Sequence, residues 1–89
     1  RNPESVVLRR EGDRVFALVA IERGHRILCL DVTDPRAPRY VTRVPVGSRP
    51  EGLLLVEEER GTFIVSANEG DDEHPSSISV MQWVGTGDQ

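Results

Sequence analysis

The apolar residues of this chain fall into short runs that are separated by glycine, proline and charged residues. No window shows an apolar repeat of about 3.6 residues that is long enough to indicate a helix. Short runs rich in Val, Ile and Leu, bounded by turn residues, predict β-strands. The predicted strands are ESVVLRR, RVFALVAIE, HRILCLDV, RYVTRVPV, GLLLVEE, GTFIVSANE and SISVMQWV. The sequence therefore predicts an all-β fold.

The residues between the runs are those that tight turns require. Gly12-Asp13 and Arg23-Gly24 are typical of hairpin turns, in which glycine adopts a positive φ at little cost. The longer join TDPRAP is expected to begin a turn at Asp34-Pro35. Pro45 predicts that the fourth strand lies at the outer edge of its sheet, because proline cannot donate to a central ladder.

The chain contains an internal repeat in which matching residues are 47 positions apart, without a gap from Pro3 to Glu22. Apolar residues also match apolar residues between the identities. Repeats of roughly 20–50 residues mark folds in which one unit cannot bury its own faces. The identical pairs are Pro3 and Pro50, Glu4 and Glu51, Leu8 and Leu55, Glu11 and Glu58, Phe16 and Phe63, Ala20 and Ala67, and Glu22 and Glu69.

The second strand of each unit is apolar at nearly every position, which predicts a strand covered on both faces. Four-stranded units stacked face to face describe the blades of a β-propeller, and a small barrel or sandwich is the alternative. The prediction is a blade over residues 1–46 and a second, C-terminal blade over 47–89. Phe16 and Phe63 should each be buried between neighbouring sheets.

The second unit has only three predicted strands, because the chain stops soon after SISVMQWV. It is therefore expected to be incomplete and to be closed by a strand from elsewhere. The expected partners are the remaining blades of a larger propeller, supplied by another chain or by self-association, because two blades alone would expose apolar sheet faces.

Charge and composition narrow the range of other partners. The net charge is −4 and all eleven basic residues are arginine, which argues against nucleic acid or an anionic membrane surface as the main partner. The longest clean apolar run, Val15 to Ile21, is far shorter than the roughly 20 residues of a membrane span. Cys29 is the only cysteine, and within RILCLDV it is expected to be a small buried hydrophobic residue.

Three segments of the second unit, PEGLLLV, TFIVSANE and SISVMQW, resemble the closing blade of the bacterial extracellular propellers known as choice-of-anchor I domains. The join LDVTDPRAPRYV is similar to the connection of LVIVD-type repeats in the same proteins. The resemblance covers Pro3 to about Val84. It implies a secreted or cell-surface location and a propeller of more than two blades. Members of the family stand alone or are fused to phosphatase-like and other hydrolase domains.

Polar residues at the strand ends supply the first candidate site. A Pro-Glu pair enters the first strand of each unit and a glutamate leaves the second, so these side chains should gather at one rim. Carboxylates and an amide oxygen suit Ca²⁺ or Mg²⁺, and the alternative is that they hydrogen-bond to loop backbone and join blade to blade. The predicted rim cluster consists of Glu4, Glu22, Glu51, Asn68 and Glu69.

The loop after Glu69, GDDEHPSS, supplies a weaker candidate. Asp71, Asp72, Glu73 and His74 could contact a metal or a partner, although such a run is more often a solvated loop. The spacing is not that of an EF-hand, and neither H-E-x-x-H nor a G-x-S-x-G elbow is present. Phe16, Tyr40, Phe63 and Trp83 are expected to be core residues rather than a sugar-binding platform.

Two functions follow from these observations. The first is a non-catalytic propeller segment, which acts as a scaffold or ligand-binding module of a secreted or surface bacterial protein. The second is part of a metal-dependent hydrolase of the phosphoesterase type, in which the rim carboxylates hold a divalent cation.

Overall fold

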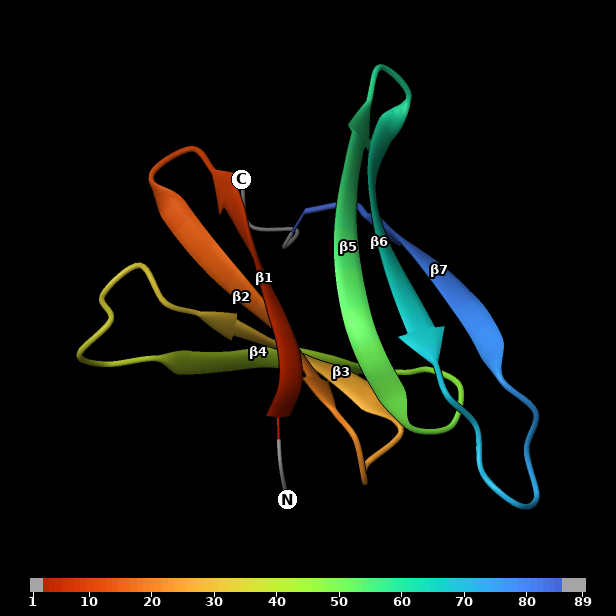
Figure 1. Cartoon of the computed structure of the whole chain (residues 1–89). Coiled ribbons are helices and arrows are strands. Elements are labelled where there is room, and N and C mark those ends of the chain that lie inside the picture. Colours follow the sequence, from red (N-terminus) through yellow and green to blue (C-terminus); the bar gives the residue numbers. More distant parts are fainter. Residues whose placement is uncertain (1–2, 86–89) are drawn as a thin grey trace.

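The computed structural model describes residues 3–85 of the chain, with side chains for residues 5–85. The described residues form seven strands and no helix, so the all-β prediction is confirmed (Figure 1). Accordingly, this part of the chain has no helix that could cross a membrane. The strands are β1 (Pro3–Glu11), β2 (Arg14–Ile21), β3 (Arg26–Asp31), β4 (Arg39–Pro45), β5 (Pro50–Glu58), β6 (Gly61–Asn68) and β7 (Ser77–Trp83).

The strands form two antiparallel sheets that follow the chain order. The first sheet has the order β1-β2-β3-β4 and the second has the order β5-β6-β7. The prediction of a four-stranded sheet followed by a three-stranded one is thus confirmed for residues 3–85. Pro45 lies in β4, an edge strand, as expected from its missing N–H.

The internal repeat is reproduced in the pairing register of the two hairpins. Ser5 pairs with Ala20 in the first sheet, and Gly52 pairs with Ala67 in the second. Both registers shift at the same place, just after Pro3 and just after Pro50. The offset seen in the sequence therefore corresponds to one hairpin geometry used twice, including its irregularity.

Turns form at all three predicted places, and one of them differs from the prediction in its backbone conformation. Gly12 has φ 60° at the first position of a two-residue hairpin turn, which suits glycine. The backbone carbonyl of Asp34 accepts from the N–H of Ala37 at 2.9 Å, and this hydrogen bond closes the turn that begins at Asp34-Pro35. The predicted hairpin turn at Arg23-Gly24 also forms, between the paired residues Ile21 and Arg26. The expectation that its glycine has the positive φ is wrong, because the left-handed residue of that loop is His25, with φ 52°.

The core lies between the facing surfaces of the two sheets, which we call the inner faces. Phe16, Leu18, Ala20, Ile27 and Cys29 of the first sheet pack there with Ile64 of the second. Phe16 is fully buried, and its ring lies 5.1 Å from that of Trp83. Burial raises the pKa of the Cys29 thiol, which fits the expected role of a small buried hydrophobic residue.

The opposite surfaces of the two sheets, the outer faces, are open. Val6 and Leu8 are about as exposed on the first sheet as Leu54 and Val80 are on the second. Phe63 is only half-buried, so the expectation that it would be buried like Phe16 is wrong. The reason is that Phe63 pairs with Val56 and Gln82 on the outer face, whereas the neighbouring Ile64 points into the core.

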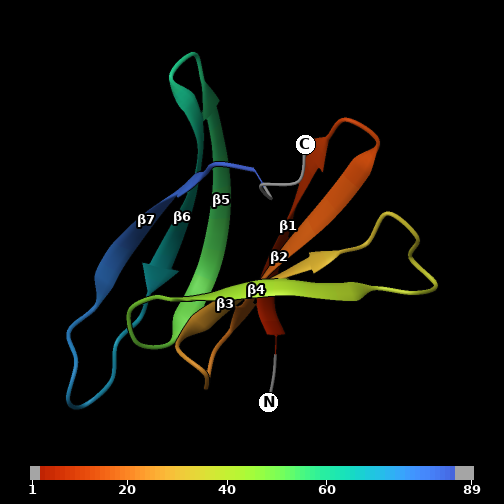
Figure 2. The same ribbon diagram turned by 180° about the vertical axis from the view of Figure 1, so that it is seen from behind.

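The two sheets are closest along their first strands and diverge toward their last. β1 lies beside β5, and β4 and β7 are splayed apart on the other side (Figure 2). The accessible surface is 6004 Å², more than the roughly 5,200 Å² typical of a folded chain of this mass. The radius of gyration, 13.2 Å, also exceeds the value of about 12 Å expected for this length. Both values indicate that the two sheets form a less compact unit than a typical domain of this size.

Candidate functional site

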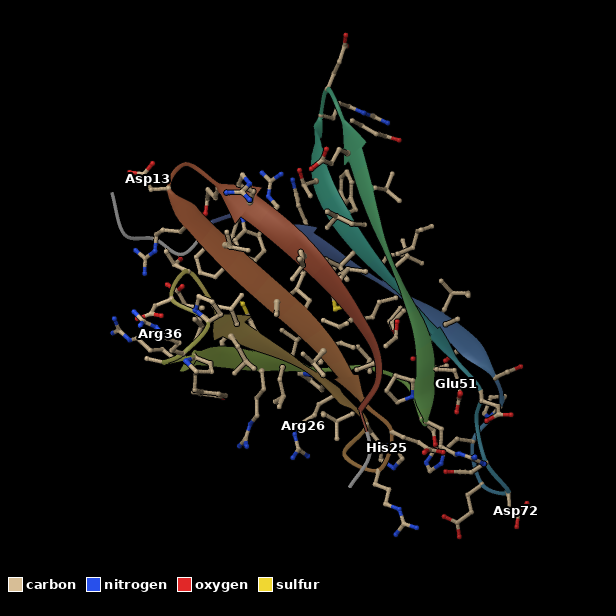
Figure 3. The ribbon with its side chains drawn as sticks, turned by 60° about the vertical axis from the view of Figure 1, so that its left-hand side comes forward. Asp13, His25, Arg26, Arg36, Glu51 and Asp72 are labelled. Carbon is tan, nitrogen blue, oxygen red and sulfur yellow. The ribbon has the colours of Figure 1, made fainter. Side chains whose placement is uncertain are left out.

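The loops that follow β2 and β6 and the segment that precedes β5 meet at one end of the two sheets. We call this region, residues 22–25, 46–51 and 68–76, the loop end. Figure 3 shows His25, Glu51 and Asp72 there, whereas Asp13 and Arg36 lie at the far end of the first sheet. Strand pairing places the start of β5 beside the end of β6, and the contact of Arg49 with Glu22 brings the loop after β2 to the same end.

Arg49 connects the two sheets at the loop end. Its Nη2 lies 2.9 Å from Glu22 Oε2, which follows β2, and 3.3 Å from Glu69 Oε1, which follows β6. The hydrogen bond to Glu22, together with the charges of Glu69 and Glu51, raises the pKa of the Arg49 guanidinium. The structure therefore brings Glu22 and Glu69 together as the sequence predicted, and an arginine stands between them.

Arg49 and His25 are two left-handed residues in contact with each other. Arg49 has φ 56°, and its backbone N–H donates to His25 Nδ1 at 3.2 Å. The carbonyl of His25 in turn accepts from the N–H of Val46 at 3.0 Å. A positive φ is uncommon for residues with a side chain. Here the positive φ of both residues is held by hydrogen bonds between the loop after β2 and residues 46–49, which join β4 to β5 and which we call the linking segment.

Asn68 lies in a buried polar network of the second sheet. Its side chain accepts from Ser66 Oγ at 2.8 Å and donates to Ser79 Oγ at 2.9 Å and to Ser77 Oγ at 3.2 Å. The side chain is nearly inaccessible to solvent. Ser79 Oγ also accepts from the N–H of Gly47 at 3.2 Å, so the network reaches the linking segment. Buried polar groups that are satisfied in this way fix the geometry around them.

Asp71 organises the loop between β6 and β7. Its carboxylate accepts from Ser48 Oγ at 2.6 Å, from His74 Nδ1 at 2.8 Å and from the N–H of Glu73 at 2.9 Å. These hydrogen bonds, the one from Ser48 first, hold the pKa of Asp71 well below its usual range. Gly70, at φ 86°, allows the loop to turn where a Cβ would lie 2.6 Å from the His74 carbonyl oxygen.

The remaining predicted residues are spread around this network. Glu51 lies beside Ala67 and Ser77 at the border of the outer face, and Asp72 lies at the exposed tip of the loop (Figure 3). The backbone of Glu4 lies in β1, but its side chain is outside the described residues.

The loop end has few features of a catalytic or metal centre. Among the described residues, no three His, Cys, Asp or Glu side chains are placed to hold one ion. The Ca²⁺ or Mg²⁺ site stays a prediction. Ser48 donates to the Asp71 carboxylate and not to a histidine, and the lowered pKa of Asp71 makes this carboxylate a weak base for activating a hydroxyl.

The sequence pattern did not indicate Arg49, Ser48 or the serines around Asn68 as site residues. The repeat does not single out Arg49, because the matching residue 47 positions earlier is Asn2 and not an arginine. The serines carried a usable signal: Ser77 and Ser79 alternate with Ile78 and Val80 in β7, and Ser66 and Asn68 alternate in β6. The two-residue period places the two polar side chains of each strand on one face, and the pairing of Ser66 with Ser79 brings all four onto the same face.

A second polar group lies at the other end of the first sheet. Arg14 Nη2 pairs with Asp31 Oδ2 at 2.8 Å, and the N–H of Thr33 donates to Asp31 Oδ1 at 2.9 Å. Hydrogen bonds from Thr33 and then from Arg14 lower the pKa of Asp31 to about 2. Thr33 Oγ1 also accepts from the N–H of Val15, so this group fastens the end of β3 to the start of β2.

Comparison of the chain with models of known families, with curated proteins and with solved structures finds no match. The resemblance to choice-of-anchor I domains therefore stays a prediction.

Proposed function

We propose that this chain forms two consecutive blades of a β-propeller and acts as a non-catalytic scaffold or binding module. The observation that carries the proposal is the way in which the two sheets stack. The two hairpins have the same pairing register, but the residues on the two inner faces do not occupy matching positions of the repeat. This contact covers the inner face of each sheet. The two outer faces, which are also unlike, remain free to contact further sheets.

The repeat offset makes this non-equivalence explicit. Val7 and Leu18 are on the inner face of the first sheet, and their counterparts Leu54 and Val65 are on the outer face of the second. Conversely, Leu55 on the inner face of the second sheet matches Leu8 on the outer face of the first. A contact between unlike faces extends into a ring or an open stack.

The shape of the pair favours a ring. The first strands β1 and β5 lie together and the last strands diverge, as blades do around a central axis (Figure 1). The loop end supports the non-catalytic assignment, because Arg49, Asp71 and Asn68 are engaged in contacts that join loop to loop and sheet to sheet. A secreted or surface location follows from the family resemblance and is part of the proposal.

The proposal predicts association through unlike outer faces, measured by sedimentation velocity. Leu8→Arg blocks the outer face of the first sheet and Leu54→Arg that of the second. Both residues are exposed within the chain, so neither change disturbs its own core. We expect the wild type to associate, each variant alone to remain monomeric, and an equimolar mixture to form heterodimers. The mixture recovers one contact because each variant retains the face that the other lacks.

The matched control is Ala37→Arg, which adds the same charge in an exposed turn away from both outer faces. It should associate as the wild type does. A wild-type chain that stays monomeric and melts cooperatively at every concentration would contradict the propeller proposal. Variants that dimerise alone but not with each other would indicate contact between like faces, which also contradicts it.

A further inference from the structure

The outer face of the first sheet is basic. Residues that pair across an antiparallel sheet lie on the same face, and successive residues of a strand alternate between faces. Arg43 pairs with Leu28 on the outer face, and Arg10 lies two residues after Leu8 in β1. Arg26 lies on the same face at the loop end, one residue after His25 (Figure 3). Among the described residues of β1 to β4, this face carries these three arginines and no acidic side chain.

The outer face of the second sheet is acidic. Glu58 is exposed at the end of β5, two residues after Val56 on the same face. Glu51 and Glu69 line a recess at the loop-end border of the face, where Glu69 also pairs with Arg49 of the linking segment. The strands β5, β6 and β7 contain no arginine or lysine. The acidic charge of this face is therefore not balanced within its own strands.

The two outer faces thus complement each other in charge and share an apolar centre. The exposed apolar side chains are Val6 and Leu8 on the first sheet and Leu54, Ile78 and Val80 on the second. Contact between two first-sheet faces would bring arginines together, and contact between two second-sheet faces would bring glutamates together. Like charges placed opposite each other at an interface oppose association, whereas opposite charges favour the unlike pair. The charge pattern therefore fits a second copy of this chain whose first sheet meets the second sheet of its neighbour.

The contact between the inner faces supplies a register for this outer contact. At the end opposite the loop end, Arg9 Nη1 lies 2.8 Å from Glu57 Oε2 and joins the two inner faces. In the 47-residue repeat, Glu57 matches Arg10 and Arg9 matches Val56. A second copy that stacks in the same way places its Arg10 at Val56, and Glu58 is the next residue along that face of β5.

We propose that the chain binds a second copy of itself head to tail, with loop end beside loop end, and that Arg10 of one copy pairs with Glu58 of the other. The apolar centres supply the buried area, and the charges select the unlike faces and their register. A head-to-tail contact of this kind leaves one outer face at each end of the pair, so further copies can add. This inference rests on the proposed function, because it requires that unlike outer faces meet.

The test is a charge-reversal cycle on the full chain, with association measured by sedimentation velocity over a series of concentrations. Arg10→Glu and Glu58→Arg each replace an attraction between copies with a repulsion, and each should weaken association about threefold or more. The double variant Arg10→Glu/Glu58→Arg carries opposite charges again and should associate as the wild type does. Both side chains are exposed within the chain, so neither change disturbs its own core.

The matched control is Arg36→Glu, which makes the same charge change in an exposed turn and should leave association unchanged. Single variants that associate as the wild type does, a double variant that is not restored, or equal weakening by Arg36→Glu would each overturn this inference. In those cases the mixing experiment with Leu8→Arg and Leu54→Arg can still yield heterodimers, so the proposed function is judged separately. A wild-type chain that does not associate would overturn both.

Discussion

The hairpins β1-β2 and β5-β6 have the same strand register and different surroundings. Phe16 and Phe63 occupy the same place in that register, one opposite Arg9 and the other opposite Val56. Phe16 is fully buried because the second sheet covers it, whereas Phe63 faces a side that no described element covers. The repeat thus determines local pairing, and burial depends on what stands next to each sheet.

The same hairpins differ in chemistry where they end. Ile21 closes β2 as a buried apolar residue, and its counterpart Asn68 closes β6 inside a network of serine hydroxyls. The second sheet uses its polar end to hold the linking segment through Ser79 and Gly47. One position of a repeat can therefore serve packing in one unit and attachment in the next.

The largest effect is expected from removing the two phenylalanines. Phe16→Ala should lower the free energy of unfolding by roughly 3–5 kcal/mol, because it empties a filled core site. Phe63→Ala should cost clearly less in the monomeric chain, since its ring is half-exposed there. Urea unfolding of both variants in the Leu54→Arg background, which is expected to be monomeric, measures the difference. Equal losses would contradict the difference in burial.

A smaller effect is expected from exchanging the residues that end the two hairpins. Asn68→Ile leaves Ser66, Ser77 and Ser79 without their shared partner and should cost about 1–3 kcal/mol. Ile21→Asn buries an amide in an apolar position and should cost a similar amount. Urea unfolding measures both. A neutral Asn68→Ile would contradict the view that the network holds this end of the sheet together.

The fold could largely be predicted from the sequence, because strands and hairpins are determined by residues that are close together in the chain. Apolar runs, turn residues and the 47-residue offset identify strands and hairpins, and all seven strands were found. Phe63 was misplaced because the pattern shows which strand is apolar and not which of its faces is covered. The positive φ at His25 was missed because hydrogen bonds to Val46 and Arg49, distant in sequence, favour it there over Gly24.

The candidate site was predictable only in its location. Strand direction places Glu22 and Glu69 at one end, and the structure brings them together. Their connection through Arg49 could not be predicted from the sequence, because the guanidinium is placed by a loop whose backbone is irregular. Likewise, the run Asp71 to His74 resembles a solvated loop, and the hydrogen bond from Ser48 that ties it to the linking segment depends on tertiary contact.

The smallest effect compares the acids at the two ends, Asp31 in the first sheet and Asp71 in the second. Hydrogen bonds lower the pKa of both carboxyls in the folded chain, that of Asp31 to about 2. A lowered pKa contributes stability that is complete above the unfolded value of about 3.9 and is lost as pH falls through the folded value. Urea unfolding from pH 7 to acid pH should therefore show a loss of stability that begins near pH 4.

The variants Asp31→Asn and Asp71→Asn should each be less stable at pH 7, and each should lose less stability on acidification than the wild type. The control Asp72→Asn, at the exposed loop tip, should follow the wild type. An acid profile that neither Asp31→Asn nor Asp71→Asn alters would show that these hydrogen bonds do not stabilise the folded state.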